Sequence, residues 1–266
     1  MKQEETDLTS MFDLSGKTAL VAGASAGLGA DAALAYARAG ADVALLARRL
    51  EKLEAIKCEI EEKTSRRALA VRCDLTEEGD VKSAVQTVLD TFGHIDILLN
   101  NAGVALHGGV DDMDTETWDK SFDTNVRSMY FTCKYVVPHM KKRRYGKIVN
   151  VSSVNAVIAD KSDLFIRHAY NASKAAVVGL TTGMACSYAQ YGITVNCVGP
   201  ALFETEMTKE RLFKSEEFLS YYSAMNPAGR PGAKGELNGT LLYLSSDASS
   251  YVQGQFIRVD GGASIV

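Results

Sequence analysis

The sequence predicts a single α/β domain in which helices cover both faces of a doubly wound parallel sheet. Short apolar runs alternate with longer amphipathic stretches almost to the C-terminus. The runs are apolar on both faces, as parallel strands between two helical layers must be. No Pro-, Gly- or Ser-rich linker divides the 266 residues, a length that one large domain accommodates. Alternation of strands and helices implies right-handed crossovers and therefore a doubly wound sheet.

The elements are expected in a regular order along the chain. The expected strands are residues 18–22, 43–47, 68–72, 95–100, 147–151, 193–198 and 256–259, and the expected helices are 28–39, 50–63, 77–92, 115–142, 170–191 and 236–245. Residues 1–15 are expected to form a polar leader, and residues 16–266 the domain. The irregular stretches 154–169 and 201–233 are long for connections in a compact domain, and such loops are often functional.

The composition excludes several classes of protein. Hydrophobic residues make up 46% of the chain and charged residues 23%, which excludes a disordered protein. A net charge of −4 argues against a nucleic-acid partner, because phosphate binding favours a basic surface. The N-terminus does not resemble a signal peptide and no apolar run has transmembrane length, so we expect a cytoplasmic protein without a membrane partner. The five cysteines and four histidines lack ligand spacing, and no metal site is expected.

A glycine-rich turn follows the first expected strand and leads directly into a helix. Residues 22–29 are AGASAGLG, a spacing typical of a nucleotide-binding, Rossmann-type domain. Glycine permits the tight turn and the close approach of a pyrophosphate, and the helix N-terminus attracts phosphate. The alternative is a plain strand–helix turn in which small residues pack closely. The residues expected to hold the cofactor here are Gly23, Ser25, Gly27, Leu28 and Gly29.

The end of the second expected strand indicates which dinucleotide is bound. Folds that select NAD usually place an acidic residue here to hold the ribose 2′-hydroxyl, whereas arginine suits a 2′-phosphate. Ala47 stands in the place of the acid and is followed by Arg48 and Arg49. These residues favour NADP(H), with Arg48 as the main phosphate ligand and Arg49 as a second. The alternative is a pair of solvated arginines at the start of a helix.

Further motifs follow the later expected strands, lie in the long expected helix or open the next one. They are Asn100-Asn101-Ala102-Gly103, Asn125, Ser152-Ser153, Tyr170-Asn171-Ala172-Ser173-Lys174, Asn196-Cys197-Val198-Gly199-Pro200, Thr205 and Val259-Asp260-Gly261-Gly262. In this order and spacing, the chain resembles the short-chain dehydrogenase/reductase family from about Leu14 to its end, and within it the gluconate 5-dehydrogenase-like branch. The resemblance implies an oxidoreductase that transfers a hydride between NADP(H) and a secondary alcohol or ketone.

The chemistry of the motifs agrees with this resemblance. Tyr170 and Lys174 are four residues apart on a helix and therefore share a face. A nearby ammonium group favours the phenolate, so we expect Lys174 to lower the pKa of Tyr170 and make it a proton-transfer group. The resemblance assigns Ser153 to hydrogen-bond the substrate oxygen, with Ser152 as the alternative. It also assigns Lys174 to the nicotinamide ribose and Asn125 to a water relay.

The resemblance implies further cofactor contacts. Asp74 and Leu75 are expected at the adenine, Asn101, Ala102 and Gly103 beside the adenosine ribose, and Pro200, Phe203 and Thr205 at the nicotinamide end. Each functional residue also has a plain structural interpretation. Asn125 could satisfy backbone groups at a helix irregularity, the serines could bond at a strand end, and Tyr170 could cap a packing face. A non-catalytic NADP-binding scaffold or sensor is the alternative class, and the presence of Ser153, Tyr170 and Lys174 disfavours it.

The substrate is less well defined by the sequence. A sugar acid or polyol is favoured by the branch that the chain resembles, and Lys161, Arg167 and His168 are candidates to bind a carboxylate. A hydroxysteroid, bile acid or 3-oxoacyl chain is the alternative, because the expected substrate lid around 201–233 is rich in aromatic residues. Those aromatic residues could equally pack the lid onto the domain.

The resemblance also implies a homo-oligomer, either a dimer or a tetramer. Helices 115–142 and 170–191 would then carry an exposed apolar strip, for which Met129, Tyr130, Cys133 and Val137 are the candidates on the first helix. The alternative is an ordinary core-facing surface.

Overall fold

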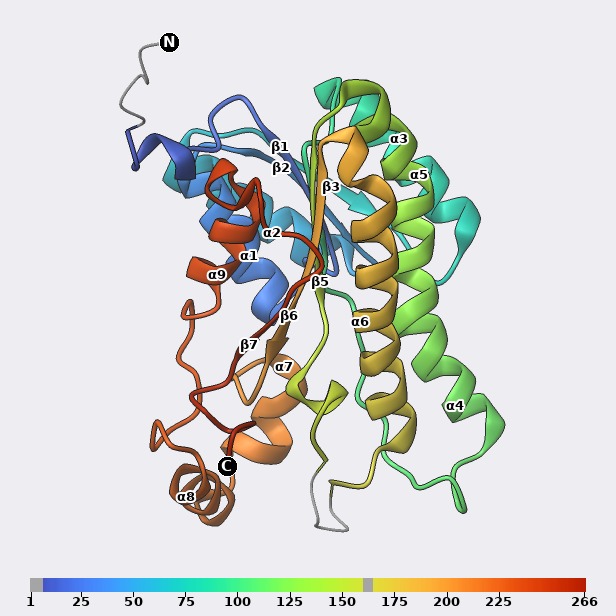
Figure 1. The fold of residues 1–266 in the computed structure, drawn as a ribbon, viewed down its shortest axis with the longest axis vertical. Helices are drawn as coiled ribbons and strands as arrows, with labels where there is room; N and C mark the ends of the chain where they lie inside the picture. The colour runs from blue at the N-terminus through green and yellow to red at the C-terminus, as the bar shows by residue number, and fades with distance from the viewer. Residues whose placement is uncertain (1–6, 160–164) are drawn as a thin grey trace.

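The computed structural model describes residues 7–159 and 165–266. Its centre is a parallel sheet of seven strands in the order β3-β2-β1-β4-β5-β6-β7 (Figure 1). The strands are β1 (Thr18–Ala22), β2 (Asp42–Ala47), β3 (Ala68–Arg72), β4 (Ile97–Asn100), β5 (Gly146–Val151), β6 (Ile193–Pro200) and β7 (Phe256–Val259). The predicted fold class, a doubly wound parallel α/β domain, is confirmed.

Helices lie on both faces of the sheet. They are α1 (Gly27–Arg38), α2 (Leu50–Thr64), α3 (Glu78–Phe92), α4 (Thr115–Phe122), α5 (Ser128–Arg143), α6 (His168–Tyr188), α7 (Glu206–Thr208), α8 (Glu216–Met225) and α9 (Asn238–Ser245). One core packs α1, α2 and α9 on the sheet, and the other packs α3, α5 and α6 on the opposite face. Successive residues of β1 alternate between the two cores, so that Val21 lies in the first and Leu20 in the second. This explains why the strands are apolar on both faces.

The strand order reverses between β1 and β4, which pair in parallel with Ala22 opposite Asn100. In open parallel sheets a ligand binds outside the carboxyl ends of the strands at such a reversal, because the connections leave on opposite faces there. The glycine-rich turn follows β1, and the Asn100–Gly103 motif begins with the last residue of β4. The topology therefore brings two motifs that are distant in sequence to one crevice.

The long helix expected over residues 115–142 is interrupted. α4 ends at Phe122, a π-helical turn spans Asp123–Arg127, and α5 begins at Ser128. Asn125 lies in this wider turn, and its side chain bonds the backbone of Val104 on both the N–H and the carbonyl. Because π-helical turns contain one more residue than the α-helical repeat, apolar periodicity does not reveal them. The expectation of one continuous helix was wrong.

The apolar strip expected on the surface of α5 lies largely in the core. Met129, Cys133 and Val137 are buried, and only Tyr130 is substantially exposed, at 49%. Because α5 packs against α3 and the sheet, this face of the helix is used within the domain. The expectation of an exposed strip was therefore wrong for three of its four residues.

Two other differences concern element boundaries and loops. The stretch 201–233 contains α7 and α8, so it is less irregular than expected. α6 begins at His168, two residues before Tyr170, and places that tyrosine inside the first helical turn. Leu14, near the end of the expected leader, is buried, and its amide donates to the Ala39 carbonyl at 2.8 Å. In the described part of the chain, no helix combines the length and apolarity needed to cross a bilayer.

Candidate active site

A cavity of about 1070 Å³ runs from the glycine-rich turn to the N-terminal end of α6 and the segment that carries α7 and α8. Two of the predicted site residues, Gly29 and Asn125, do not line it. The others do, and they are Gly23, Ser25, Gly27, Leu28, Arg48, Arg49, Asp74, Leu75, Asn101, Ala102, Gly103, Ser153, Tyr170, Lys174, Pro200, Phe203 and Thr205. The fold therefore gathers residues from six strand ends around one space.

The glycine-rich turn is shaped by close backbone approach. Gly23 has φ +87°, and a Cβ atom there would lie 2.6 Å from the Ala102 amide nitrogen. At Gly29, a Cβ atom would overlap the carbonyl oxygen of Gly23 and lie 2.5 Å from Asn101 Nδ2. Asn101 Nδ2 donates to that same carbonyl at 2.8 Å. Gly29 thus lets α1 pack under the turn, and the cavity wall is bare backbone where a pyrophosphate would approach.

The two arginines after β2 have different surroundings. Arg49 donates to Ser25 Oγ at 3.0 Å and forms a 2.7 Å ion pair with Glu206, which also pairs with Lys52. Arg48 is exposed, and within residues 7–159 and 165–266 it has no hydrogen bond or ion pair. The Ala47 side chain has no hydrogen-bonding group, and its backbone carbonyl already accepts from Cys73 N at 2.9 Å. Arg48 is therefore the arginine that can turn to an anionic group at this end of the cavity.

Asp74 lies beside these arginines at the end of β3. Its Oδ1 accepts from the amide and the hydroxyl of Thr76, at 3.0 and 2.7 Å. Burial acts to raise the pKa of Asp74, but the Thr76 hydrogen bonds and the positive charge of Arg48 outweigh it and hold the pKa below its usual value. Asp74 is thus a fixed carboxylate at the end of the cavity that carries Arg48 and Arg49.

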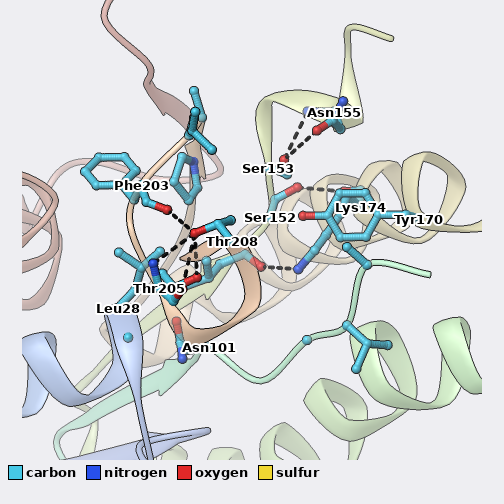
Figure 2. Close-up of a pocket in the computed structure, with 18 of the residues that line it drawn as sticks. Leu28, Asn101, Ser152, Ser153, Asn155, Tyr170, Lys174, Phe203, Thr205 and Thr208 are labelled. Carbon is cyan, nitrogen blue, oxygen red and sulfur yellow. Dashed lines mark hydrogen bonds between the residues drawn. The ribbon is translucent and has the colours of Figure 1, made fainter. Parts of the chain in front are cut away.

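Ser153, Tyr170 and Lys174 meet at the other end of the cavity. Figure 2 shows Ser153 and Tyr170 close together, with Lys174 beside Tyr170 and with Phe203, Thr205 and Thr208 across the space. Ser152 is turned away, because its hydroxyl donates to the Lys174 carbonyl at 2.8 Å. Ser153 lies close enough to the Tyr170 hydroxyl to act on its pKa. The geometry favours Ser153 over Ser152 as the serine that meets a substrate.

Burial controls the ionisation of the pair. The pKa of Tyr170 is raised by burial, which outweighs the lowering effects of the nearby Ser153 hydroxyl and of the positive charge of Arg167. Burial also lowers the pKa of Lys174 to about 8. Its ammonium donates to the Val151 carbonyl at 2.9 Å and lies 5.7 Å from the centre of the Tyr170 ring. The expected lowering of the Tyr170 pKa is therefore not seen, because desolvation disfavours the phenolate more strongly.

Asn125 and Lys174 both approach Gly103. Its Oδ1 accepts from Val104 N at 2.7 Å, and its Nδ2 donates to Val104 O and Ser173 Oγ, both at 2.9 Å. A Cβ atom on Gly103 would lie 3.1 Å from Asn125 Oδ1 and 3.2 Å from Lys174 Nζ. The absence of a side chain on Gly103 therefore leaves room for both side chains, and Asn125 satisfies the backbone of Val104.

Several lining residues were not predicted from the sequence. Asn155 Oδ1 accepts from Ser153 Oγ at 3.3 Å, and the backbone N–H of Asn155 donates to that hydroxyl at 3.2 Å. Asn171 Nδ2 donates to the carbonyls of Asn155 and Ile158 and fixes the loop after β5. Thr208 Oγ1 donates to Phe203 O at 2.7 Å. The position of Asn171 beside Tyr170 was the only sequence signal for this network.

The end of the cavity beside Tyr170, called the substrate end here, combines aromatic side chains with Arg167. Phe165, Phe218, Tyr221 and Tyr222 line it, and the rings of Phe165 and Phe218 lie 5.4 Å apart. The three candidate carboxylate ligands differ in placement: Arg167 lines the cavity, His168 Nδ1 accepts from Val110 N at 3.1 Å, and Lys161 lies outside the described residues. Among the described residues no group of three or more His, Cys, Asp or Glu could hold a metal ion.

Comparison with known proteins identifies the family. The model of the short chain dehydrogenase family matches residues 17–215. The chain belongs to the short-chain dehydrogenase/reductase family. A gluconate 5-dehydrogenase of Gluconobacter oxydans is 40% identical over 255 residues, which cover 96% of this chain and 97% of that protein. The family assignment, the likeness to gluconate 5-dehydrogenases and the oxidoreductase class are confirmed.

Two further relatives extend this comparison. A sorbose reductase of Schizosaccharomyces pombe is 35% identical over 96% of this chain and 98% of its own. The crystal structure of a gluconate 5-dehydrogenase from Burkholderia cenocepacia in complex with NADP and tartrate has a TM-score of 0.92 and 32% identity, and it covers 98% of this chain and 100% of that one.

Proposed function

We propose that this short-chain dehydrogenase/reductase transfers a hydride between NADP(H) and a secondary alcohol or ketone. The observation that carries the proposal is the position of Ser153, Tyr170 and Lys174 in the same cavity as the glycine-rich turn. A dinucleotide held at the turn would extend to these three side chains. A scaffold or sensor would not need these three side chains together. We therefore prefer an enzymatic function over a non-catalytic one.

The residues around the cavity fit NADP(H). The cradle at Gly23 and Gly29 has no room for a Cβ atom, and backbone amides at the α1 N-terminus suit a pyrophosphate. Ala47 stands at the position where an NAD-selective domain usually has an acidic residue. Arg48, the next residue, would hold the 2′-phosphate. The Burkholderia gluconate 5-dehydrogenase, which binds NADP in its crystal structure, supports the same choice. When bound, the cofactor supplies the hydride chemistry.

The protein's own side chains transfer the proton to and from the substrate. Tyr170 exchanges a proton between its hydroxyl oxygen and the substrate oxygen, and Ser153 donates a hydrogen bond to that oxygen. Lys174, which is buried, holds its ammonium group beside the ring and orients the ribose. Asn125 anchors the relay through which the proton reaches water. The ribose role of Lys174 and the relay role of Asn125 are those that the family resemblance implies.

A sugar acid or polyol is the substrate class that we propose, supported by the gluconate 5-dehydrogenase and sorbose reductase relatives. Residues 201–233 would form the lid over it, because Leu202, Tyr221 and Met225 line the substrate end. The second candidate is a hydroxysteroid, bile acid or 3-oxoacyl substrate, which the aromatic lining of that end favours.

NADPH oxidation by the purified protein, screened against sugar acids, ketoses, steroids and 3-oxoacyl thioesters, tests the proposal. We expect turnover of at least one ketone and a loss of nearly all of it in Tyr170→Phe, with NADPH binding kept. Binding of NADPH without turnover of any ketone would instead favour the scaffold or sensor.

We also propose that the protein forms a dimer or tetramer, as the family resemblance implies. On the outer surface of α5, the exposed Tyr130 remains the candidate contact. Light scattering at micromolar concentration tests this, and a single 28.7 kDa particle would contradict it.

A further inference from the structure

Arg167 is a cation held in the wall of the cavity next to the proposed catalytic tyrosine. Its backbone pairs with the loop after β4, where Gly108 N donates to Ile166 O at 3.0 Å and His168 N donates to Gly108 O at 3.1 Å. Its guanidinium carbon lies 5.5 Å from the centre of the Phe165 ring and 5.6 Å from that of Tyr170. Two ring faces and a backbone bridge therefore hold this charge in one place.

Part of the hydrogen-bonding capacity of Arg167 is not used within the described structure. Its Nε atom is buried and has no hydrogen-bond partner, and residues 7–159 and 165–266 provide no ion pair for the guanidinium. Among the described residues, the acidic side chains that line the cavity are Asp74 and Glu206, which lie at the cofactor end and are bonded by Thr76 and by Arg49 and Lys52. A partly buried charge without an acceptor is costly, so a ligand that brings an anion is favoured.

We infer that Arg167 binds a carboxylate of the substrate and selects anionic over neutral alcohols and ketones. The inference rests on the proposed function, since it places the substrate at Tyr170. The planar guanidinium offers paired donors that match a carboxylate. The cofactor phosphates do not compete for it, because their ligands, the glycine-rich turn and Arg48, lie at the opposite end of the cavity. The neighbouring rings of Phe165 and Phe218 admit the carbon skeleton beside the charge.

Matched pairs of acid and neutral substrates test this inference on the full chain. With NADP⁺ the pair is gluconate and sorbitol, which have the same carbon number. With NADPH the pair is 4-phenyl-2-oxobutanoate and its ethyl ester. We expect wild type to prefer the acid in at least one pair. Arg167→Met should lower the acid-to-neutral ratio of kcat/KM by about 10- to 100-fold, the effect of one charge-assisted hydrogen bond, chiefly through KM for the acid.

Three controls separate the possible causes. Arg167→Lys keeps the charge without the planar fork and should restore part of the ratio. Arg38→Met removes the same charge from an exposed site on α1 outside the cavity and should leave the ratio unchanged. The dissociation constant for NADPH should be the same in Arg167→Met and wild type, because Arg167 does not hold the cofactor.

Several results would overturn the inference. A preference for the neutral member in both pairs, or an unchanged ratio in Arg167→Met, would do so. Where turnover is too slow to measure, calorimetry with the NADP⁺-loaded protein measures binding of gluconate and 4-phenyl-2-oxobutanoate. The inference is contradicted if neither acid binds, or if wild type and Arg167→Met bind the acids equally. The proposed function fails differently, through a Tyr170→Phe variant that turns substrates over as fast as wild type.

Discussion

The two ends of the cavity are built in different ways. At the cofactor end the wall is largely backbone, and its shape depends on missing side chains, as the clash that a Cβ atom on Gly23 or Gly29 would cause demonstrates. At the substrate end the wall is made of large side chains from the segment before α6 and from helix α8, with the Phe165 and Phe218 ring centres 5.4 Å apart.

The polar groups differ in the same way. At the cofactor end Asn101, Asp74 and Arg49 are bonded within the protein and the unpaired Arg48 is exposed, whereas Arg167 at the substrate end has a buried Nε without a partner among the described residues. A site formed by backbone suits one ligand of constant shape. A site formed by side chains can change through substitutions that leave the sheet intact. The comparison explains how a common cofactor end can serve relatives that act on different substrates.

The largest effect is expected at Tyr170. Tyr170→Phe removes only the hydroxyl that exchanges the proton, so turnover should fall by about 10²- to 10⁴-fold while NADPH affinity changes little. Steady-state rates and fluorescence titration with NADPH measure the two quantities. A variant that keeps more than about a tenth of wild-type turnover would contradict the role of Tyr170, since it exceeds what loss of a general acid–base group allows.

A glycine substitution tests whether the cofactor end depends on bare backbone. Gly29→Ala would force a Cβ atom onto the Gly23 carbonyl, so we expect a loss of about 1–3 kcal/mol in the free energy of unfolding and weaker binding of NADPH by about tenfold or more. Gly179→Ala is the matched control, because nothing lies within 4 Å of its Cβ position in α6.

For that control we expect stabilisation of up to about 1 kcal/mol, from the higher helix propensity of alanine, and unchanged NADPH binding. Urea unfolding and cofactor titration measure both variants. Equal NADPH affinities in the two would show that backbone approach at Gly29 does not shape the cofactor site.

The arginines after β2 sharpen the comparison within the cofactor end. Arg48→Ala should lower kcat/KM for NADPH by about 10- to 100-fold, the loss of a charge-assisted contact of about 1.5–3 kcal/mol, and leave NADH use unchanged. Arg49→Ala should have a smaller effect, because Arg49 is paired with Glu206 and Ser25. Wild-type protein that uses NADH as well as NADPH, or an Arg48→Ala variant that loses both cofactors equally, would refute the assignment.

The smallest effect concerns the pH dependence of stability. Burial lowers the pKa of Lys174 to about 8, against 10.5 for an exposed lysine, so the unfolded chain binds more protons than the folded protein between these values. Stability of the cofactor-free protein should therefore rise with pH through this range, by about 1 kcal/mol from pH 8 to 9 relative to Lys174→Met. Urea unfolding of both proteins at these two pH values measures it. Parallel pH dependence in the two would show that Lys174 is not desolvated.

Much of the domain could be predicted from the sequence because local patterns carry it. The apolar runs predicted all seven strands, since a strand covered on both faces cannot contain exposed polar positions. The glycines at 23 and 29 predicted the turn, because backbone contact excludes any side chain there. The spacing of Tyr170 and Lys174 predicted that they would lie together, because residues four apart share a helix face.

Only the tertiary structure decided what depends on packing between distant segments. The π-helical turn at Asn125 is stabilised by the backbone of Val104, which no periodicity within the helix reveals. Burial of Met129 and Val137, and the raised pKa of Tyr170, depend on how deeply the fold encloses those side chains. Arg167 lies at the cavity because its backbone pairs with Gly108, 59 residues earlier. Sequence patterns determine local conformation, whereas the depth of burial and the meeting of loops follow from the assembled fold.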